Sequence, residues 1–167
     1  MTVTAVSRDP ESRTLTLNAE FDATPERVWE LWADPRQLER WWGPPTYPAT
    51  VDTYDLRPGG RVEYHMTGPD GDQLGGFWEV DDVQPPRLLV FRDGFLKDDG
   101  TPNDELPTTT ARVTLHDIGD GRTRMSIVSQ FPSVEAMEQL DAMGMEEGLR
   151  QAVGQIDAIL ADDPVEA

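Results

Sequence analysis

The segment from residue 23 to residue 44 constrains the fold of this chain most, because it encodes two closely spaced helix starts and four tryptophans. Thr24 and Asp34 each stand directly before a proline, the arrangement of a helix N-cap followed by a first-turn proline. Apolar residues then recur three and four positions apart, as on the buried face of a helix. They are Val28, Leu31 and Trp32 in the first stretch and Leu38, Trp41 and Trp42 in the second. The segment therefore predicts two short helices, the second of which ends at Gly43.

Seven further stretches are typical of β-strands. In the first, Leu15, Leu17, Ala19 and Phe21 alternate with polar residues, which indicates a half-buried strand. The predicted strands are residues 13–21, 49–56, 61–67, 76–83, 87–95, 108–116 and 123–131. The polar, turn-rich segment between residues 93 and 107 is predicted to be a mobile loop or rim.

Helical spacing returns in the C-terminal part of the chain. Residues 133–140 predict a short helix, and a long amphipathic helix is expected from residue 143 onward. Its apolar face consists of Met145, Leu149, Val153, Ile156, Ile159 and Leu160. Glycine costs a helix interior about 1 kcal/mol relative to alanine. Gly144, Gly148 and Gly154 are therefore expected to mark close packing, a bend or room for something else.

Length and charge bound the functions that the chain can have. A chain of 167 residues has the size of one domain, expected to span 1–167 with its core at 14–161 and flexible termini. The net charge of −18 repels nucleic acid and anionic membranes, so neither is an expected partner. The chain has no cysteine, which excludes disulfides and thiolate chemistry. The polar start and the lack of a long apolar run predict a cytoplasmic location.

The sequence has no motif for cofactor-dependent catalysis: no Gly-x-Ser-x-Gly elbow, no phosphate-binding loop and no dinucleotide fingerprint. His65 and His116 are its only histidines, and neither belongs to a zinc-ligand spacing. The acidic stretch 97–105 lacks the aspartate spacing of a calcium loop. Neither a cofactor nor a metal is therefore expected.

The order of these elements predicts an α+β fold in which an antiparallel sheet of about six to seven strands curves around a long C-terminal helix. Four segments resemble the landmarks of a known group, in its order: residues 23–29, 41–44, 79–91 and 144–149. They are similar to the START-like, or SRPBCC, superfamily with its helix-grip, plant-allergen-like fold. Within it, the chain resembles the proteins homologous to the Hsp90 ATPase activator (AHSA type). That family usually has an aromatic residue where this chain has Leu149, a difference that concerns the shape of the cavity.

The resemblance implies an interior cavity between the sheet and the long helix, used in the superfamily for apolar ligands and in some members for cyclisation. The residues themselves supply a compatible wall, because aromatic and methionine side chains occur on several predicted strands and on the helical tail. The predicted ligand-binding residues are Trp41, Trp42, Tyr64, Met66, Phe77, Phe91, Met125, Met145 and Leu149. The alternative is that these side chains fill a dry core.

Two hypotheses use such a cavity. In the first, the chain binds a hydrophobic small molecule; in the second, it is an aromatase- or cyclase-like enzyme, which needs an inward acid or base. The catalytic candidates are His65 and Glu79, with Tyr64 and Arg112 as further ionisable groups. Strand parity opposes an inward His65, and the alternative for Glu79 is the solvated face of the sheet.

A third hypothesis is a protein-interaction module. The family label suggests a chaperone partner and a role in the stress response, for which the acidic surface would need a basic partner. An exposed sheet edge could also pair two copies in a homodimer, although nothing in the sequence requires it.

Overall fold

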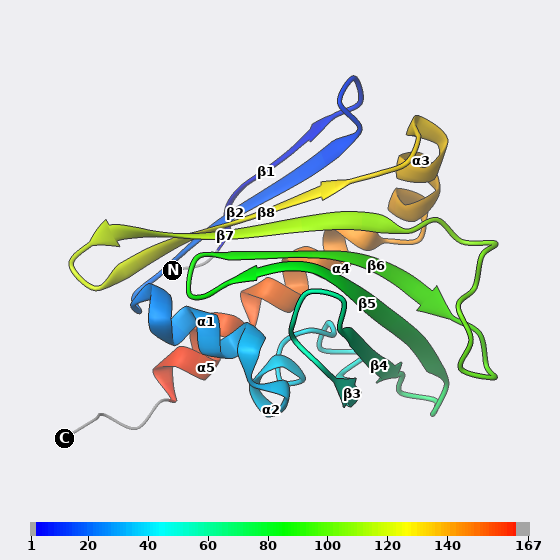
Figure 1. Cartoon of the computed structure of the whole chain (residues 1–167), viewed down its shortest axis with the longest axis horizontal. Helices are drawn as coiled ribbons and strands as arrows, with labels where there is room; N and C mark the ends of the chain where they lie inside the picture. The colour runs from blue at the N-terminus through cyan, green and yellow to red at the C-terminus, as the bar shows by residue number, and fades with distance from the viewer. Residues whose placement is uncertain (1–2, 163–167) are drawn as a thin grey trace.

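The computed structural model describes residues 3–162, and its central feature is an antiparallel sheet of eight strands (Figure 1). The strands are β1 (Val3–Asp9), β2 (Thr14–Phe21), β3 (Ala49–Tyr54), β4 (Arg61–Thr67), β5 (Gln73–Gln84), β6 (Leu88–Leu96), β7 (Thr109–Gly119) and β8 (Arg122–Gln130). Their order across the sheet is β1-β2-β8-β7-β6-β5-β4-β3, so β1 and β3 form its two edges. The predicted α+β fold is confirmed, with one strand more than the sequence predicted.

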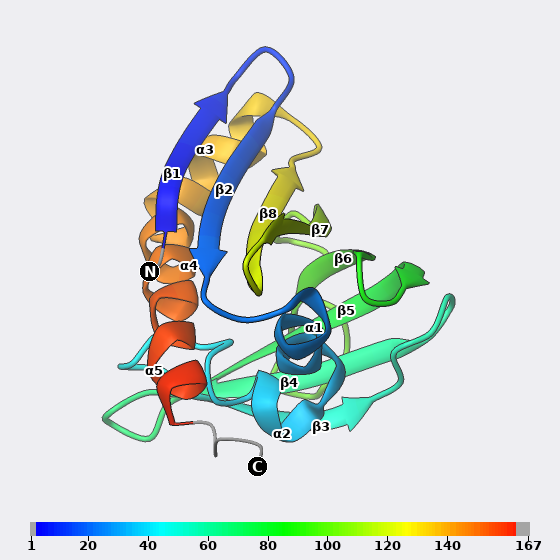
Figure 2. The ribbon, with the colours of Figure 1, turned by 90° about the vertical axis from the view of Figure 1, so that its left-hand side faces the viewer.

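The described residues also form five helices on the concave side of the curved sheet (Figure 2). They are α1 (Pro25–Ala33), α2 (Pro35–Leu38), α3 (Val134–Ala142), α4 (Met145–Gly154) and α5 (Ile156–Ala161). The last three follow one another in a column along the sheet. None of the helices within residues 3–162 has the length and apolar character needed to cross a membrane.

The two predicted helix starts are confirmed in detail. The Thr24 hydroxyl accepts a hydrogen bond from the Arg27 backbone N–H at 3.2 Å, which caps α1. The Asp34 carboxylate accepts one from the Arg36 N–H at 2.9 Å, which caps α2. Helix α2 is shorter than predicted and ends at Leu38. The turns that follow it bring Trp42 back over the core, and the backbone N–H of Trp42 donates a hydrogen bond to the Leu38 carbonyl at 2.9 Å.

Strand β1 is the strand that the sequence did not predict. It pairs with β2 along its length, for example Val6 with Leu17 and Arg8 with Leu15. An edge strand is held by backbone hydrogen bonds on one side only, and from Ala5 to Asp9 only Val6 is partly buried against the core, so apolar and polar residues do not alternate. The period-two signal that reveals a half-buried strand is therefore missing from this part of the sequence.

Residues 93–96 decide between two overlapping predictions, the strand 87–95 and the polar loop between residues 93 and 107. They continue β6 as a strand, where Asp93 pairs with Trp78 of β5 and with Thr109 of β7. Because β6 continues through Asp93, the side chain of this residue is placed in the sheet rather than in a loop.

The C-terminal helical region is divided at two points. Gly144 has a φ of 88° and separates α3 from α4, so the bend expected from glycine is confirmed there. Gln155 separates α4 from α5. At Gly148 and Gly154 the close-packing interpretation is wrong, because a Cβ at either position would meet no atom within 4 Å.

Candidate ligand-binding site

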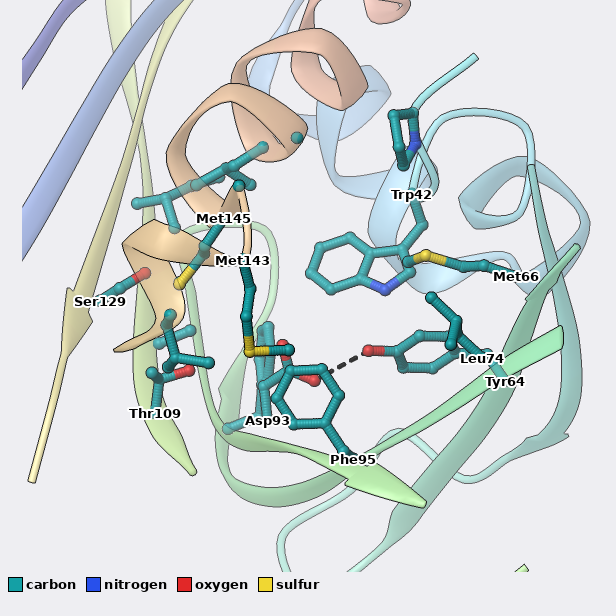
Figure 3. A pocket seen from close by; sticks show the side chains of 18 of the residues that line it. Trp42, Tyr64, Met66, Leu74, Asp93, Phe95, Thr109, Ser129, Met143 and Met145 are labelled. Atoms are coloured by element: carbon teal, nitrogen blue, oxygen red, sulfur yellow. Dashed lines mark hydrogen bonds between the residues drawn. The ribbon is translucent and has the colours of Figure 1, made fainter. Parts of the chain in front are cut away.

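A cavity of about 260 Å³ lies between strands β4 to β8 and the junction of α3 with α4 (Figure 3). Its strand walls are built mainly by inward side chains of β4, β6, β7 and β8, and its cover by residues of α3 and α4. Most of the lining is apolar, with methionine, aromatic and aliphatic side chains. A concave space with such a lining has the character of a small-molecule pocket.

Six of the nine predicted ligand-binding residues line this cavity: Trp42, Tyr64, Met66, Phe91, Met145 and Leu149. Strand parity explains the arrangement on β4, because Tyr64 and Met66 point inward while His65 between them points outward. Met145 and Leu149 are four residues apart on α4, so they share the face that covers the sheet.

Trp41 and Met125 are part of the core behind the cavity rather than of its wall. Both side chains are fully buried, and neither lines the cavity. The Trp41 indole N–H donates to the Leu31 carbonyl at 2.9 Å, which fixes the ring in the core. Placing these two residues on the wall was therefore wrong.

Phe77 lies on the other face of the sheet, and its prediction as a wall residue was also wrong. In β5 the inward residues are Trp78 and Val80, and Trp78 stacks on Phe91 with 4.0 Å between ring centroids. Phe77 is instead covered by the Arg61 guanidinium, 4.5 Å from the ring centroid. Since Phe77 and Trp78 are adjacent and both aromatic, alternation alone could not show which of them faces inward.

The two catalytic candidates from the sequence lie away from the cavity. His65 Nδ1 is 2.8 Å from the Asp52 carboxylate on the outer face. Glu79 also points outward, where it pairs with Arg92 at 3.2 Å. The outward alternative for Glu79 is thus confirmed, and neither residue reaches the cavity lining.

An acid–base pair lies in the cavity wall, formed by Tyr64, which the sequence indicated as an ionisable candidate, and Asp93, which it did not. The Tyr64 hydroxyl donates a hydrogen bond to Asp93 Oδ1 at 2.9 Å (Figure 3). Tyr64 crosses β5 at Gly76, where a Cβ would lie 2.4 Å from the Tyr64 hydroxyl oxygen. Only glycine leaves room for this approach. The signal for Asp93 was present in the sequence, because it continues the inward alternation of Leu89 and Phe91.

The environment of the pair raises the pKa of both side chains. Burial raises the pKa of Asp93 to about 7, and the hydrogen bond from Tyr64 offsets part of this rise. Burial also raises the pKa of Tyr64 well above its ordinary value, and the neighbouring Asp93 charge adds to the increase. The cavity therefore contains a carboxyl group that exchanges its proton near neutral pH.

Two buried hydroxyls extend this polar region across the sheet. Thr109 on β7 pairs directly with Asp93 on β6, and Ser129 lies on the next strand, β8. Both residues line the cavity and are nearly inaccessible to bulk solvent. We call Tyr64, Asp93, Thr109 and Ser129 the polar band. It is a hydrogen-bonding strip in an otherwise apolar cavity, so it would fix the orientation of a ligand.

The cavity reaches the surface beside two exposed apolar side chains. Leu74 is 57% exposed and Met143 is 53% exposed, and both line the cavity. They come from β5 and from the turn between α3 and α4.

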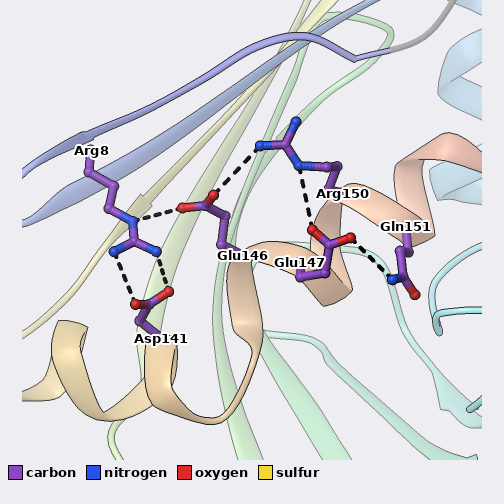
Figure 4. A network of polar contacts seen from close by, with 6 residues as sticks. All are labelled: Arg8, Asp141, Glu146, Glu147, Arg150 and Gln151. Carbon is purple, nitrogen blue, oxygen red and sulfur yellow. Dashed lines mark hydrogen bonds and ion pairs between the residues drawn. The ribbon is translucent and has the colours of Figure 1, made fainter.

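The cover of the cavity is anchored by surface ion pairs (Figure 4). Arg8 on β1 binds Asp141 at the end of α3 and donates to Glu146 at the start of α4 at 2.7 Å. Arg150 lies 3.6 Å from the second Glu146 oxygen. The Arg8 contacts hold the two helices on either side of Gly144 to the sheet edge, and the Arg150 contact lies within α4. Within residues 3–162, no group of three histidine or carboxylate side chains is placed to share a metal.

Comparison with known proteins places this geometry in context. The sequence profile of the family described as Activator of Hsp90 ATPase homolog 1-like protein matches residues 22–161. A solved protein from Arthrobacter aurescens is 49% identical, with a TM-score of 0.93, covering 99% of this chain and 95% of that one. A protein from Mycobacterium smegmatis is 48% identical, with a TM-score of 0.88, covering 97% of this chain and 99% of that one.

A more distant solved structure shares the fold alone. DynU16, from the dynemicin biosynthetic locus, is 22% identical with a TM-score of 0.63, covering 90% of this chain and 48% of that one. No curated protein matches the sequence.

Proposed function

This chain belongs to the family of activator of Hsp90 ATPase homolog 1-like proteins, and from that premise we propose that it binds a small apolar or aromatic molecule in its cavity. The observation that carries the proposal is the apolar space between the sheet and α4, interrupted only by the polar band. A cavity near 260 Å³ lies just below the usual range of about 300–1,000 Å³ for ligand pockets. It therefore suits a compact ligand of one or two rings.

The glycines of α4 support this interpretation. Gly148 lines the cavity, and a side chain at this position would extend into open space. A helix interior gains about 0.5–1 kcal/mol from alanine in place of glycine, so the sequence keeps a less stable residue where the space is. Room for a ligand accounts for that choice.

A fluorescence titration tests the proposal. Trp32 and Trp42 line the cavity, so their emission should change when one- or two-ring aromatics, flavonoids or medium-chain fatty acids bind. Gly148→Phe should fill the space and weaken binding by at least about tenfold, which is a loss of about 1.4 kcal/mol. Gly154→Phe is the matched control, because it adds the same side chain to α4 outside the cavity. Absence of saturable binding for every class would contradict the proposal and favour a protein-interaction module.

The Tyr64–Asp93 pair favours a second candidate, a cyclase-like enzyme. An ionised Asp93 could take a proton from an acidic C–H of a polyketone, and the resulting enolate could attack a second carbonyl. Asp93 would return the proton to the alkoxide, so the step conserves all atoms. The fold shared with DynU16 is compatible with this chemistry, but a fold alone does not assign a reaction.

A rate measurement distinguishes the cyclase-like function from ligand binding alone. A short aromatic β-polyketone should cyclise faster with the protein than without it, with a rate that depends on an ionisation near pH 7. Asp93→Asn should abolish the acceleration and keep the binding. If the polyketone binds without being converted, the ligand-binding function stands and the enzymatic one is excluded for this substrate class.

A further inference from the structure

The cavity contains a carboxylate but no cationic side chain. Among the described residues that line it, Asp93 and Tyr64 are the only titratable ones, and no lysine, arginine or histidine is present. The Tyr64 hydroxyl donates a hydrogen bond to Asp93 Oδ1, while Asp93 Oδ2 has no hydrogen bond within residues 3–162. Buried carboxylates are ordinarily paired with a cation or with several hydrogen-bond donors. Asp93 therefore has capacity for one more strong donor.

The residues beside Asp93 supply further acceptors. The hydroxyls of Thr109 and Ser129 make no side-chain hydrogen bond in the described part of the chain, although both residues are buried against the cavity. Thr109 is the direct cross-strand partner of Asp93, so the side chains start about 5 Å apart and can contact one group together. Oxygen atoms that can accept hydrogen bonds thus converge on one end of an apolar space.

We propose that the polar band binds the protonated amine of an apolar ligand. This inference rests on the proposed ligand-binding function and specifies the ligand class. An ammonium group presents three N–H donors, which match Asp93 Oδ2 and the neighbouring hydroxyls. The aromatic rings of Trp42 and Phe95, which also line the cavity, favour a nearby cation. The net charge of −18 attracts cations to the protein from a distance.

Other head groups fit the polar band less well. A ligand carboxylate would place a second negative charge beside Asp93 without a cation to balance it. A neutral alcohol can donate only one hydrogen bond and leaves the Asp93 charge uncompensated. The order of affinity expected for one apolar body is therefore amine, then alcohol, then carboxylate.

Three naphthalene compounds with the same ring system test this order: naphthylethylamine, naphthylethanol and naphthylacetate. Isothermal titration calorimetry at pH 8, where the amine is protonated and Asp93 is ionised, should show the amine binding at least about tenfold more tightly than the alcohol. Amine affinity should fall from pH 8 to pH 5 as Asp93 gains a proton, while alcohol affinity stays nearly constant.

Asp93→Asn should remove the preference, because it keeps the size of the side chain and the acceptor for Tyr64 but removes the charge. The matched control is Asp98→Asn, which removes the same charge at an exposed position outside this cavity and should leave the preference intact. Thr109→Val should weaken binding of the amine more than binding of the alcohol. Circular dichroism establishes that each variant is folded before the titration.

The outcomes separate this inference from the proposed function. If the alcohol binds with one-to-one saturation and the amine binds no more tightly, the ligand-binding function stands and the amine subsite is overturned. An amine preference that survives in Asp93→Asn also overturns it. If none of the three compounds binds, both the cavity function for two-ring aromatics and the amine subsite fail.

Discussion

The two ends of the inner sheet face are packed in opposite ways. Under α1 and α2, large rings fill the space: Trp78 stacks on Phe91 at 4.0 Å, and Trp32 meets Trp41 edge-on at 4.7 Å between centroids. We call these four residues the aromatic core, and two of them, Trp32 and Phe91, also border the cavity. Under α3 and α4, the sheet carries small side chains, such as Ala111 of β7 and the hydroxyls of the polar band, and the helix carries glycines.

This contrast shows that side-chain volume, rather than backbone architecture, decides where the fold is solid and where it is hollow. The strands of one curved sheet run through both regions. A close-packed interior leaves few voids larger than a water molecule, so a persistent space needs small residues on both of its walls. The cavity end has them, and the aromatic core does not.

The largest expected effect breaks the aromatic core. Trp78→Ala should lower the free energy of unfolding by about 3–5 kcal/mol, because Trp78 is fully buried and its ring is lost from a stacked pair. Leu149→Ala at the cavity should cost about 1 kcal/mol or less, because Leu149 is only partly buried and already borders open space. Denaturant unfolding of both variants measures the difference, and equal losses would contradict the contrast.

The second effect concerns the charge in the cavity. Because the Asp93 pKa is raised to about 7, the folded protein holds a proton that the unfolded chain releases near pH 4. Stability should therefore fall as pH rises from about 4 to about 7, by at most about 1.4 kcal/mol for each pH unit from this group. The free energy of unfolding of Asp93→Asn should depend less on pH than that of the parent, and the variant should be the more stable protein at pH 8.

Unfolding free energies between pH 4 and pH 8 measure this dependence. Asp98→Asn is the control, since its exposed carboxylate has no cavity environment to lose. Identical slopes for the parent and Asp93→Asn would show that Asp93 is solvated like a surface carboxylate.

A smaller effect should follow from closing the gap through which Tyr64 reaches Asp93. The new Cβ of Gly76→Ala would lie 2.4 Å from the Tyr64 hydroxyl oxygen, so the ring must shift and its hydrogen bond to Asp93 should break. Overpacking of this kind costs about 1–3 kcal/mol. Carbon-detected NMR titration of the Asp93 carboxyl should show a pKa above that of the parent, because the stabilising donor is gone. An unchanged pKa would mean that Tyr64 keeps its contact.

Local signals explain which parts of this architecture the sequence could predict. The caps at Thr24 and Asp34 depend on adjacent residues, so they were read correctly. The inward face of β4 was also predicted, because Tyr64 and Met66 flank a polar residue. The residues of the aromatic core and of the cavity wall were harder to separate, since both sets are apolar at similar spacing. Only the packing of elements far apart in the chain distinguishes a filled region from an empty one.

The errors have equally specific causes. Asp93 lay where the predicted strand 87–95 overlapped the predicted loop, and it was not among the predicted wall residues, although its parity continues that of Phe91. Strand β1 was missed because an exposed edge strand needs no apolar alternation. Phe77 was placed on the wrong face because its neighbour, Trp78, is also aromatic. For β1 and Phe77, only the tertiary position of the residues decides their place, whereas the local alternation was sufficient to place Asp93.

The smallest expected effect concerns how easily the two regions, the cavity end and the aromatic core, open locally. Arg8→Gln removes the ion pairs that hold α3 and α4 to β1, and exposed pairs of this kind contribute about 0–1 kcal/mol to global stability. The loss should be local: amide hydrogen exchange should become faster in α4 over the cavity, while the strands of the aromatic core keep their protection. Arg124→Gln, which breaks an exposed pair with Glu20 between β8 and β2, is the control and should leave α4 unchanged. Because a helix over a cavity has fewer packing contacts than one over a filled core, it depends more on its surface anchors. Faster exchange spread evenly over the sheet would instead mean that the two regions open together.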